Sequence, residues 1–292
     1  RNTKSKKSNF YMTNILEAIF NISQLKELTV EDIAFGSNRA TSVGDGLESF
    51  IKDAFTNTFN ELDKKVKFDK YKDSFSYEGS SRTPPDLMLK GGDAIEVKKT
   101  ESITSDLQLN SSHPKAKLFS TSSLINKHCV SCEEWSEKDF IYAIGHIPKG
   151  LKILSSLWFI DGSIYAADED VYLSLKKTLT DKIEETPNID FSPTNEIGRV
   201  NFVDPLKITN LRIRGMWLLH PPHKVFNYVH GYDSDKKFQC ITILPVVKYN
   251  SFPKESKDKL ETIDSIHLTE VEVRDPNNPV NMINCKLIKY VI

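Results

Sequence analysis

The stretch from Thr83 to Lys99, TPPDLMLKGGDAIEVKK, constrains the fold of this chain more than any other part of the sequence. Two short apolar runs, PDLML and AIEVKK, flank the segment KGGD. Glycine adopts positive φ angles without a steric cost, so the paired glycines favour a tight turn between two antiparallel strands. The sequence predicts a β-hairpin whose returning strand alternates between core-facing and outward-facing side chains.

The returning strand places opposite charges on one face. Residues two apart in a strand point to the same side, so Glu96 and Lys98 project together while Val97 enters the core. Asp86, near the start of the first strand, adds a second carboxylate. Carboxylates bind Mg²⁺, which can activate a water for phosphodiester hydrolysis, and a lysine can orient that water. The spacing fits such a centre; a solvent-facing hairpin with a Glu–Lys pair is the structural alternative.

Elsewhere the chain alternates between helical and strand patterns. Residues 42–62, SVGDGLESFIKDAFTNTFNEL, carry an apolar stripe at helical spacing, and residues 168–185 predict a helix with a polar face. Strand-like runs occur at residues 73–79, 139–147, 151–167 and 238–249. Strands mixed with helices predict an α/β fold with a central mixed β-sheet flanked by helices.

Composition limits the class of protein. The 292 residues are 39% hydrophobic, which suffices for one domain over residues 1–292. The best boundary candidate is residues 185–198, ETPNIDFSPTNEIG, and a separate C-terminal subregion after about residue 250 stays open. Lys and Arg number 39 against 40 Asp and Glu, so the net charge of −1 does not itself point to a polyanion partner. Four cysteines and the lack of an apolar run of about 20 residues predict a cytoplasmic protein without a membrane segment.

Several motifs resemble known nucleases. The hairpin residues PD…EVK resemble the PD-(D/E)xK nuclease superfamily. Three further stretches, GSNRATSVGDGLESFIKDAF, LQLNSSHPKAKL and TNLRIRGMW, resemble the restriction endonucleases of the NgoPII type, which cleave GGCC. The resemblance runs in blocks from about Gly36 to Trp217. It implies a restriction-endonuclease-like core and Mg²⁺ as the cofactor.

The resemblance also implies roles for individual residues. Asp86 and Glu96 are the expected metal ligands, and Lys98 is expected to assist the attacking water, so these three are the candidate catalytic residues. Glu48, on the preceding helix and outside its apolar stripe, matches the position of an additional acidic metal ligand in many enzymes of the superfamily. The nearby alternatives to Glu48 are Asp45 and Asp53.

Three polar segments are candidates for holding DNA. Phosphate contacts position a duplex, whereas contacts to base edges select its sequence. The hydroxyls, amides and lysines of LNSSHPKAKL suit phosphate oxygens, and two arginines in LRIRG suit guanine, which arginine contacts through two hydrogen bonds. The candidate DNA-binding residues, including two from SNRA, are Asn38, Arg39, Asn110, Ser111, Ser112, His113, Lys115, Lys117, Arg212 and Arg214.

These features together predict a Mg²⁺-dependent type II restriction endonuclease that cuts double-stranded DNA at a short palindrome. If the resemblance extends to specificity, that palindrome is GGCC. A palindrome is matched by a two-fold homodimer, since each subunit reads one half. A structure-specific or repair nuclease and a non-catalytic DNA-binding protein remain as alternatives. Zinc binding by Cys129 and Cys132 also stays open, because a single C-x₂-C pair is a weak zinc signature.

Overall fold

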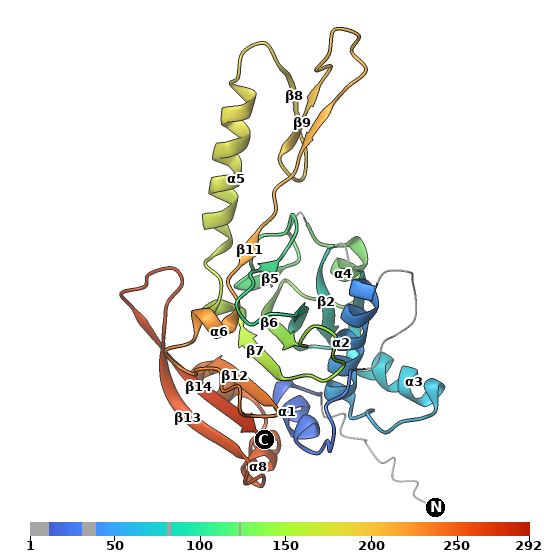
Figure 1. The fold of residues 1–292 in the computed structure, drawn as a ribbon, viewed down its shortest axis with the longest axis vertical. Coiled ribbons are helices and arrows are strands. Elements are labelled where there is room, and N and C mark those ends of the chain that lie inside the picture. Colours follow the sequence, from blue (N-terminus) through green and yellow to red (C-terminus); the bar gives the residue numbers. More distant parts are fainter. Residues whose placement is uncertain (1–11, 31–38, 81–82, 123) are drawn as a thin grey trace, which may run out of the picture.

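The computed structural model of the chain has two parts, a body built on one large sheet and an arm that projects from it (Figure 1). The structure describes residues 12–30, 39–80, 83–122 and 124–292, with the backbone alone for residues 39–45 and 80. Asn38 therefore lies outside the described residues, as do the side chains of Arg39 and Asp45. The arm comprises residues 169–214.

The body is organised around a mixed sheet. In spatial order its strands are β1 (Phe75–Ser80), β2 (Thr83–Leu89), β3 (Ala94–Thr100), β6 (Glu137–His146), β7 (Ser156–Asp161), β12 (Gln239–Pro245), β14 (Met282–Val291) and β13 (Ile266–Arg274), and β5 (Lys117–Phe119) pairs with β6. Strand β3 pairs with β6 in parallel, as does β7 with β12, and the other neighbours are antiparallel. The predicted α/β fold with a central mixed sheet is confirmed.

Each face of the sheet has its own apolar core, because neighbouring residues of a strand point to opposite sides. In β6, Ile141 and Ala143 join one cluster, whereas Phe140, Tyr142 and Ile144 join the other. The helices that contribute to the first cluster or flank it are α1 (Ile15–Ser23), α2 (Arg39–Thr56), α3 (Lys64–Ser74), α7 (Val246–Ser251) and α8 (Lys254–Glu261). The second cluster includes the fully buried Trp158 of β7.

Helix α2 follows the stripe expected from the sequence. Leu47, Phe50, Ile51, Ala54 and Phe55 are all buried, and they pack with residues of α1 and the sheet. The helix thereby covers the sheet beside β3, with which it is in contact. As expected, Glu48 lies outside this stripe, and the structure shows it half-buried.

Two predicted strand runs are shorter than their apolar patterns. The run at residues 151–167 forms β7 and then a short 3₁₀ helix, Gly162–Ile164. The run at residues 238–249 divides at Pro245 into β12 and α7. Proline has no N–H for a strand ladder but fits the start of a helix, so it marks the change of structure.

The arm consists of one helix and a narrow sheet that rise together from the body (Figure 1). Its elements are α5 (Glu169–Glu184), β8 (Asp190–Pro193), β9 (Gly198–Asn201) and β10 (Leu211–Ile213). The three strands pair in the order β10, β9, β8. Residues 185–198, the boundary candidate in the sequence, form β8, its two flanking loops and the first residue of β9.

The base of the arm is anchored to the body. After β10, strand β11 (Leu218–Leu219) pairs with β4 (Leu107–Gln108), and Trp217 exchanges backbone hydrogen bonds with Leu109 and Asn110 at 2.9 and 2.8 Å. The ring of Tyr172 in α5 lies 5.4 Å from the ring of Trp217. The two ends of the arm therefore meet at one place. Short helices α4 (Lys127–Ser131) and α6 (Pro222–Val225) complete the body.

Within the described parts of the chain, no helix combines the length and apolar character needed to cross a membrane.

Candidate active site

The hairpin of β2 and β3 brings two carboxylates and a lysine together. Glu96 is 8% exposed, and its Oε1 lies 2.6 Å from the Lys98 Nζ. One oxygen of Asp86 accepts a hydrogen bond of 2.7 Å from the backbone N–H of Val97. The predicted placement of Glu96 and Lys98 on the same side of the strand is confirmed, and Asp86 lies beside them.

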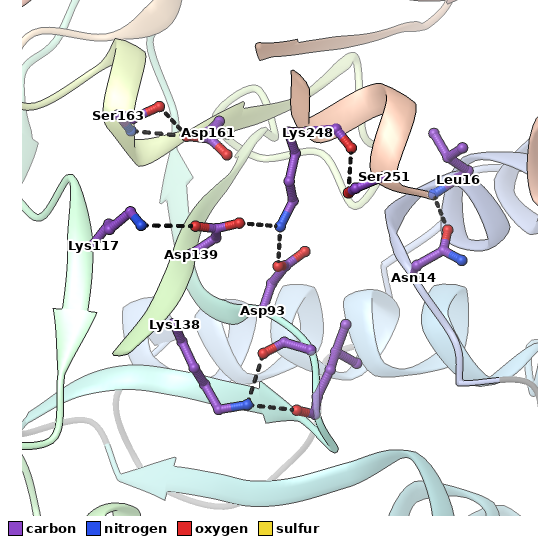
Figure 2. Close-up of polar contacts among 12 residues, drawn as sticks. Asn14, Leu16, Asp93, Lys117, Lys138, Asp139, Asp161, Ser163, Lys248 and Ser251 are labelled. Atoms are coloured by element: carbon purple, nitrogen blue, oxygen red, sulfur yellow. Dashed lines mark hydrogen bonds and ion pairs between the residues drawn. The ribbon is translucent and has the colours of Figure 1, made fainter. Parts of the chain in front are cut away.

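The turn of the hairpin is held from outside. Gly91 has a φ of 61°, as the paired glycines led us to expect. The buried Lys138 of β6 donates hydrogen bonds to the backbone carbonyls of Leu89 and Gly92 at 3.3 and 2.7 Å. The Lys248 ammonium of α7 lies between Asp93, in the turn, and Asp139 of β6 (Figure 2). Two lysines, one from the neighbouring strand β6 and one from helix α7, thus fix the position of the hairpin.

Burial and neighbouring charges shift the pKa values of Asp86 and Lys98. Burial, and next the negative charge of Glu96, raise the pKa of Asp86 well above its ordinary value. Burial alone would lower the pKa of Lys98, but the adjacent Glu96 and Asp86 outweigh it and raise that pKa. Lys98 is therefore held in its charged form. It can orient a water and stabilise negative charge, but it is a poor proton acceptor at neutral pH.

The donor set fits a small, hard cation. Among the described residues, the second oxygen of Glu96, Oε2, is buried and has no hydrogen-bond partner. A cation between this oxygen and Asp86 would satisfy it and offset the repulsion between the carboxylates. No group of three or more His, Cys, Asp or Glu side chains is arranged for a metal within the described part of the chain. The fit is to Mg²⁺ held by two carboxylates, since this ion keeps several waters.

Glu48 lies near this pair without joining it. Its carboxylate forms an ion pair of 2.9 Å with Lys52, which also contacts Glu78 at 2.9 Å. The charge of Glu48 nevertheless contributes to the raised pKa of Asp86. Its alternative, Asp53, accepts hydrogen bonds from three side chains of the body at 2.5 to 2.7 Å, which points to a structural role.

The hairpin forms one wall of a pocket of about 560 Å³. The polar loop after β4 forms a second wall, and residues at the base of the arm form a third. The lining residues with polar side chains are Thr83, Asp86, Glu96, Lys98, Asn110, Ser111, Ser112, His113, Lys115, Tyr142, Asn195, Glu196, Arg212 and Arg214. The structure therefore unites most of the candidate residues in one place.

The polar loop contributes in two ways. Asn110 is exposed, and the buried hydroxyl of Ser112 has no hydrogen-bond partner among the residues described. His113 and Lys115 are instead 6% and 4% exposed. The ring of His113 stacks on Tyr172 at 5.2 Å, and burial lowers the pKa of His113 and that of Lys115. Within this loop, exposure and the unpaired hydroxyl make Asn110 and Ser112 the best suited to an incoming ligand.

Lys117 lies outside this pocket. Its ammonium pairs with Glu137 at 2.9 Å on the surface of β6.

A carboxylate of the arm holds both candidate arginines. Glu196 lies in the turn between β8 and β9, and its oxygens are 3.0 Å from Arg212 Nη2 and 2.9 Å from Arg214 Nη2. Ser111 donates a hydrogen bond of 2.7 Å to the same carboxylate. Hydrogen bonding from Ser111, reinforced by the arginines, lowers the pKa of Glu196. Each arginine side chain remains 62% exposed, so both are oriented and still accessible.

Sequence reasoning missed Glu196. It is separated from Arg212 of β10 by strand β9 and a loop, and its turn carries no pattern that distinguishes a ligand-binding carboxylate from a solvated one. Only the pairing of β9 with β10 brings it to the arginines.

Comparison with known proteins identifies the family. The model of the NgoPII restriction endonuclease family matches residues 13–275. The chain belongs to this family. The Type II restriction enzyme NgoPII of Neisseria gonorrhoeae is 42% identical to it over 281 residues, which cover 95% of this chain and 99% of that protein. No solved structure matches the chain.

Membership of the NgoPII family confirms the resemblance drawn from the motifs and the expectation of a type II restriction endonuclease. A restriction enzyme acts on DNA, and type II enzymes generally use Mg²⁺. The pocket, with its paired carboxylates on one wall and two accessible arginines on another, is therefore the candidate site of the family's reaction in this chain.

The raised pKa of Asp86 predicts a gain in stability on neutralising it. The folded state binds the Asp86 proton more tightly than the unfolded state, so above the raised folded-state pKa the ionised carboxylate destabilises the metal-free fold. Asp86→Asn should raise the free energy of unfolding at pH 8 by about 0.5–2 kcal/mol. The gain should shrink as the pH falls through that pKa.

Urea unfolding followed by tryptophan fluorescence checks this expectation. Adding Mg²⁺ should stabilise the wild type and have little effect on Asp86→Asn. Equal stabilisation of both proteins by Mg²⁺, or a loss of stability in the variant at pH 8, would contradict it.

Proposed function

We propose that this protein is a Mg²⁺-dependent homodimeric endonuclease of the cytoplasm that hydrolyses both strands of double-stranded DNA at the palindrome GGCC. The proposal rests on one observation above all: the Asp86–Glu96–Lys98 group shares its pocket with the arginines held by Glu196. Groups suited to cleaving a phosphodiester and groups suited to reading guanine thus lie within reach of one bound duplex. The choice of GGCC follows the NgoPII-type motifs.

The residues of the hairpin have distinct parts in this proposal. Asp86 and Glu96 would hold Mg²⁺, which supplies polarisation of a phosphoryl oxygen and activation of a water when it is bound. The backbone N–H of Val97 fixes the orientation of Asp86. Lys98 orients Glu96 through their 2.6 Å contact, and its charge stabilises the negative charge that develops on the phosphate.

The walls of the pocket would position the duplex. Asn110 and the unpaired hydroxyl of Ser112 suit phosphate oxygens, which fix the register of the DNA without reading its sequence. Arg212 and Arg214 suit the O6 and N7 atoms of guanine in the major groove. Glu196 restricts the orientation of both guanidinium groups before DNA arrives, which lowers the entropic cost of forming those contacts.

Digestion of plasmid DNA tests the proposal. Purified protein is incubated with and without Mg²⁺, and the fragment ends are sequenced. Discrete Mg²⁺-dependent fragments with every end at GGCC are the expected result. Preferential cutting of a branched substrate would indicate a structure-specific nuclease, and salt-dependent binding without cleavage would indicate a DNA-binding protein; either would refute the proposal.

Arg214→Lys should weaken discrimination by the enzyme. Lysine keeps the charge but lacks the planar pair of donors that guanine requires. We expect the preference for GGCC over a site with one substituted base pair to fall by about 1–3 kcal/mol, or roughly 5- to 150-fold. Competition binding in Ca²⁺ measures it.

Lys117→Ala, at a surface lysine outside the pocket, is the control and should leave the preference unchanged. A uniform loss of affinity for all sequences in Arg214→Lys would instead assign Arg214 to a phosphate contact.

A further inference from the structure

Helix α5 carries an apolar stripe that the rest of the described chain does not cover. Val171, Leu175 and Leu179 follow at intervals of four residues and so lie on one side of the helix. Their side chains are 56%, 50% and 47% exposed. Other residues of α5 face the arm and the body. Tyr172 packs against Trp217, and Lys176 donates a hydrogen bond to the backbone carbonyl of Asn195. The helix is amphipathic, but its apolar side faces solvent.

The ends of this stripe carry opposite charges. Asp168 lies three residues before Val171, and Lys182 lies three residues after Leu179, so both fall on the side of the stripe. Asp168 occupies the N-cap position of α5 without making a side-chain capping bond. Lys182 is highly exposed and contacts only Glu185, at 2.6 Å, among the ion pairs of the described residues. A stripe with Asp168 at one end and Lys182 at the other complements a copy of itself running in the opposite direction, where Asp168 would replace the exposed Glu185 as the partner of Lys182.

We propose that this stripe is a contact surface between two copies of the chain, with the α5 helices antiparallel and each Leu175 at the two-fold axis. In that arrangement Val171 of one copy faces Leu179 of the other. Asp168 faces Lys182 twice, once on each side of the axis. The choice of a second copy rests on the proposed function, because each half of a palindrome presents its strand to one copy.

The tip of the arm supplies a second apolar group in the loop between β9 and β10. Its exposed side chains are Phe202, Val203, Leu206 and Ile208. Asp204 orders this loop by accepting hydrogen bonds from three of its backbone N–H groups at 3.0, 3.1 and 2.6 Å. An antiparallel helix pair brings the tip of each arm toward the base of the other, where Met216 and Leu218 are also exposed. At each end of the contact, the apolar loop of one copy then meets Met216 and Leu218 of the other.

Measuring the mass of the protein in solution tests this surface without DNA or metal. By sedimentation equilibrium, the wild type should be a dimer at micromolar concentration. Leu175→Arg places two like charges at the axis and should raise the dimer Kd at least about 100-fold. Leu173→Arg is the matched control, since Leu173 lies on the same helix, off the stripe and 38% exposed. A monomeric wild type, or equal Kd values for all three proteins, would overturn the proposal.

Charge exchange and cross-linking separate loss of contact from loss of folding. Asp168→Lys and Lys182→Asp should each weaken the dimer, and the double variant should restore it. In Leu175→Cys a short bis-maleimide should link two chains, whereas Leu173→Cys should give no more product than the wild type. Failure of the rescue together with absence of the cross-link would refute the antiparallel register. Because none of these readouts involves cleavage, an inactive but dimeric protein would count against the proposed function and leave this surface intact.

Discussion

Glu96→Gln lowers the rate of Mg²⁺-dependent cleavage of a GGCC duplex by about 1,000-fold or more in our expectation. Glutamine keeps the shape of the side chain but removes the charge that would hold the cation and the 2.6 Å ion pair that fixes Lys98. Single-turnover cleavage with enzyme in excess over DNA measures the chemical step directly. Affinity for the duplex in Ca²⁺ should change much less than the rate, because the arginines and the polar loop are untouched.

Glu272→Gln is the matched control for that experiment. Glu272 is an exposed residue of β13, at the far edge of the sheet from the hairpin, so the same change of charge should leave cleavage unaltered. A Glu96→Gln enzyme that keeps a tenth or more of the wild-type rate would remove Glu96 from the metal site. The buried Oε2 without a partner would then need another explanation.

Lys248→Met destabilises the protein by about 3–5 kcal/mol in our expectation, because it leaves the buried carboxylate of Asp93 and the partly exposed carboxylate of Asp139 without this counter-charge. Lys248 lies between Asp93 and Asp139, with the Asp139 contact at 2.6 Å (Figure 2). Asp93 is 7% exposed, and burial already raises its pKa in spite of the lysine. Urea unfolding at pH 8 measures the loss.

Two further variants show whether the effect comes from the charge. Adding Asp93→Asn to Lys248→Met should recover part of the stability, since it removes the unpaired carboxylate. Lys259→Met breaks a half-exposed ion pair of 2.7 Å with Glu17 and should cost less than about 1 kcal/mol. If Lys248→Met and Lys259→Met cost the same, the Lys248 bridge does not hold the turn of the hairpin.

The hairpin and helix α2 were predictable because their signals are local. Each signal is contained in a short stretch of sequence: the Gly-Gly turn, the alternation of AIEVKK and the apolar stripe from Leu47 to Phe55. They were enough to place Glu96 and Lys98 on one side of a strand. The family motifs added the roles of those residues, which alternation alone does not supply.

The arm and the support of the hairpin were not predictable in the same way. Strands β8 to β10 have three or four residues each and little burial, so they show no clear alternation. Asp93 and Lys248 are 155 residues apart, and nothing near either one indicates the other. His113 and Lys115 lie in a loop with polar composition, and only the three-dimensional structure shows that they are buried.

The arm begins and ends at one point, where the rings of Tyr172 and Trp217 meet. Removing residues 169–214 from the topology leaves every strand of the central sheet with its neighbours, because the arm strands pair only with one another. Genetic exchange of this segment between related genes would therefore alter Glu196, Arg212 and Arg214 as one inherited unit while preserving the hairpin that carries Glu96. Under the proposed function, such an architecture would let new target sequences evolve by recombination of a single contiguous block, while the residues proposed for hydrolysis stay unchanged.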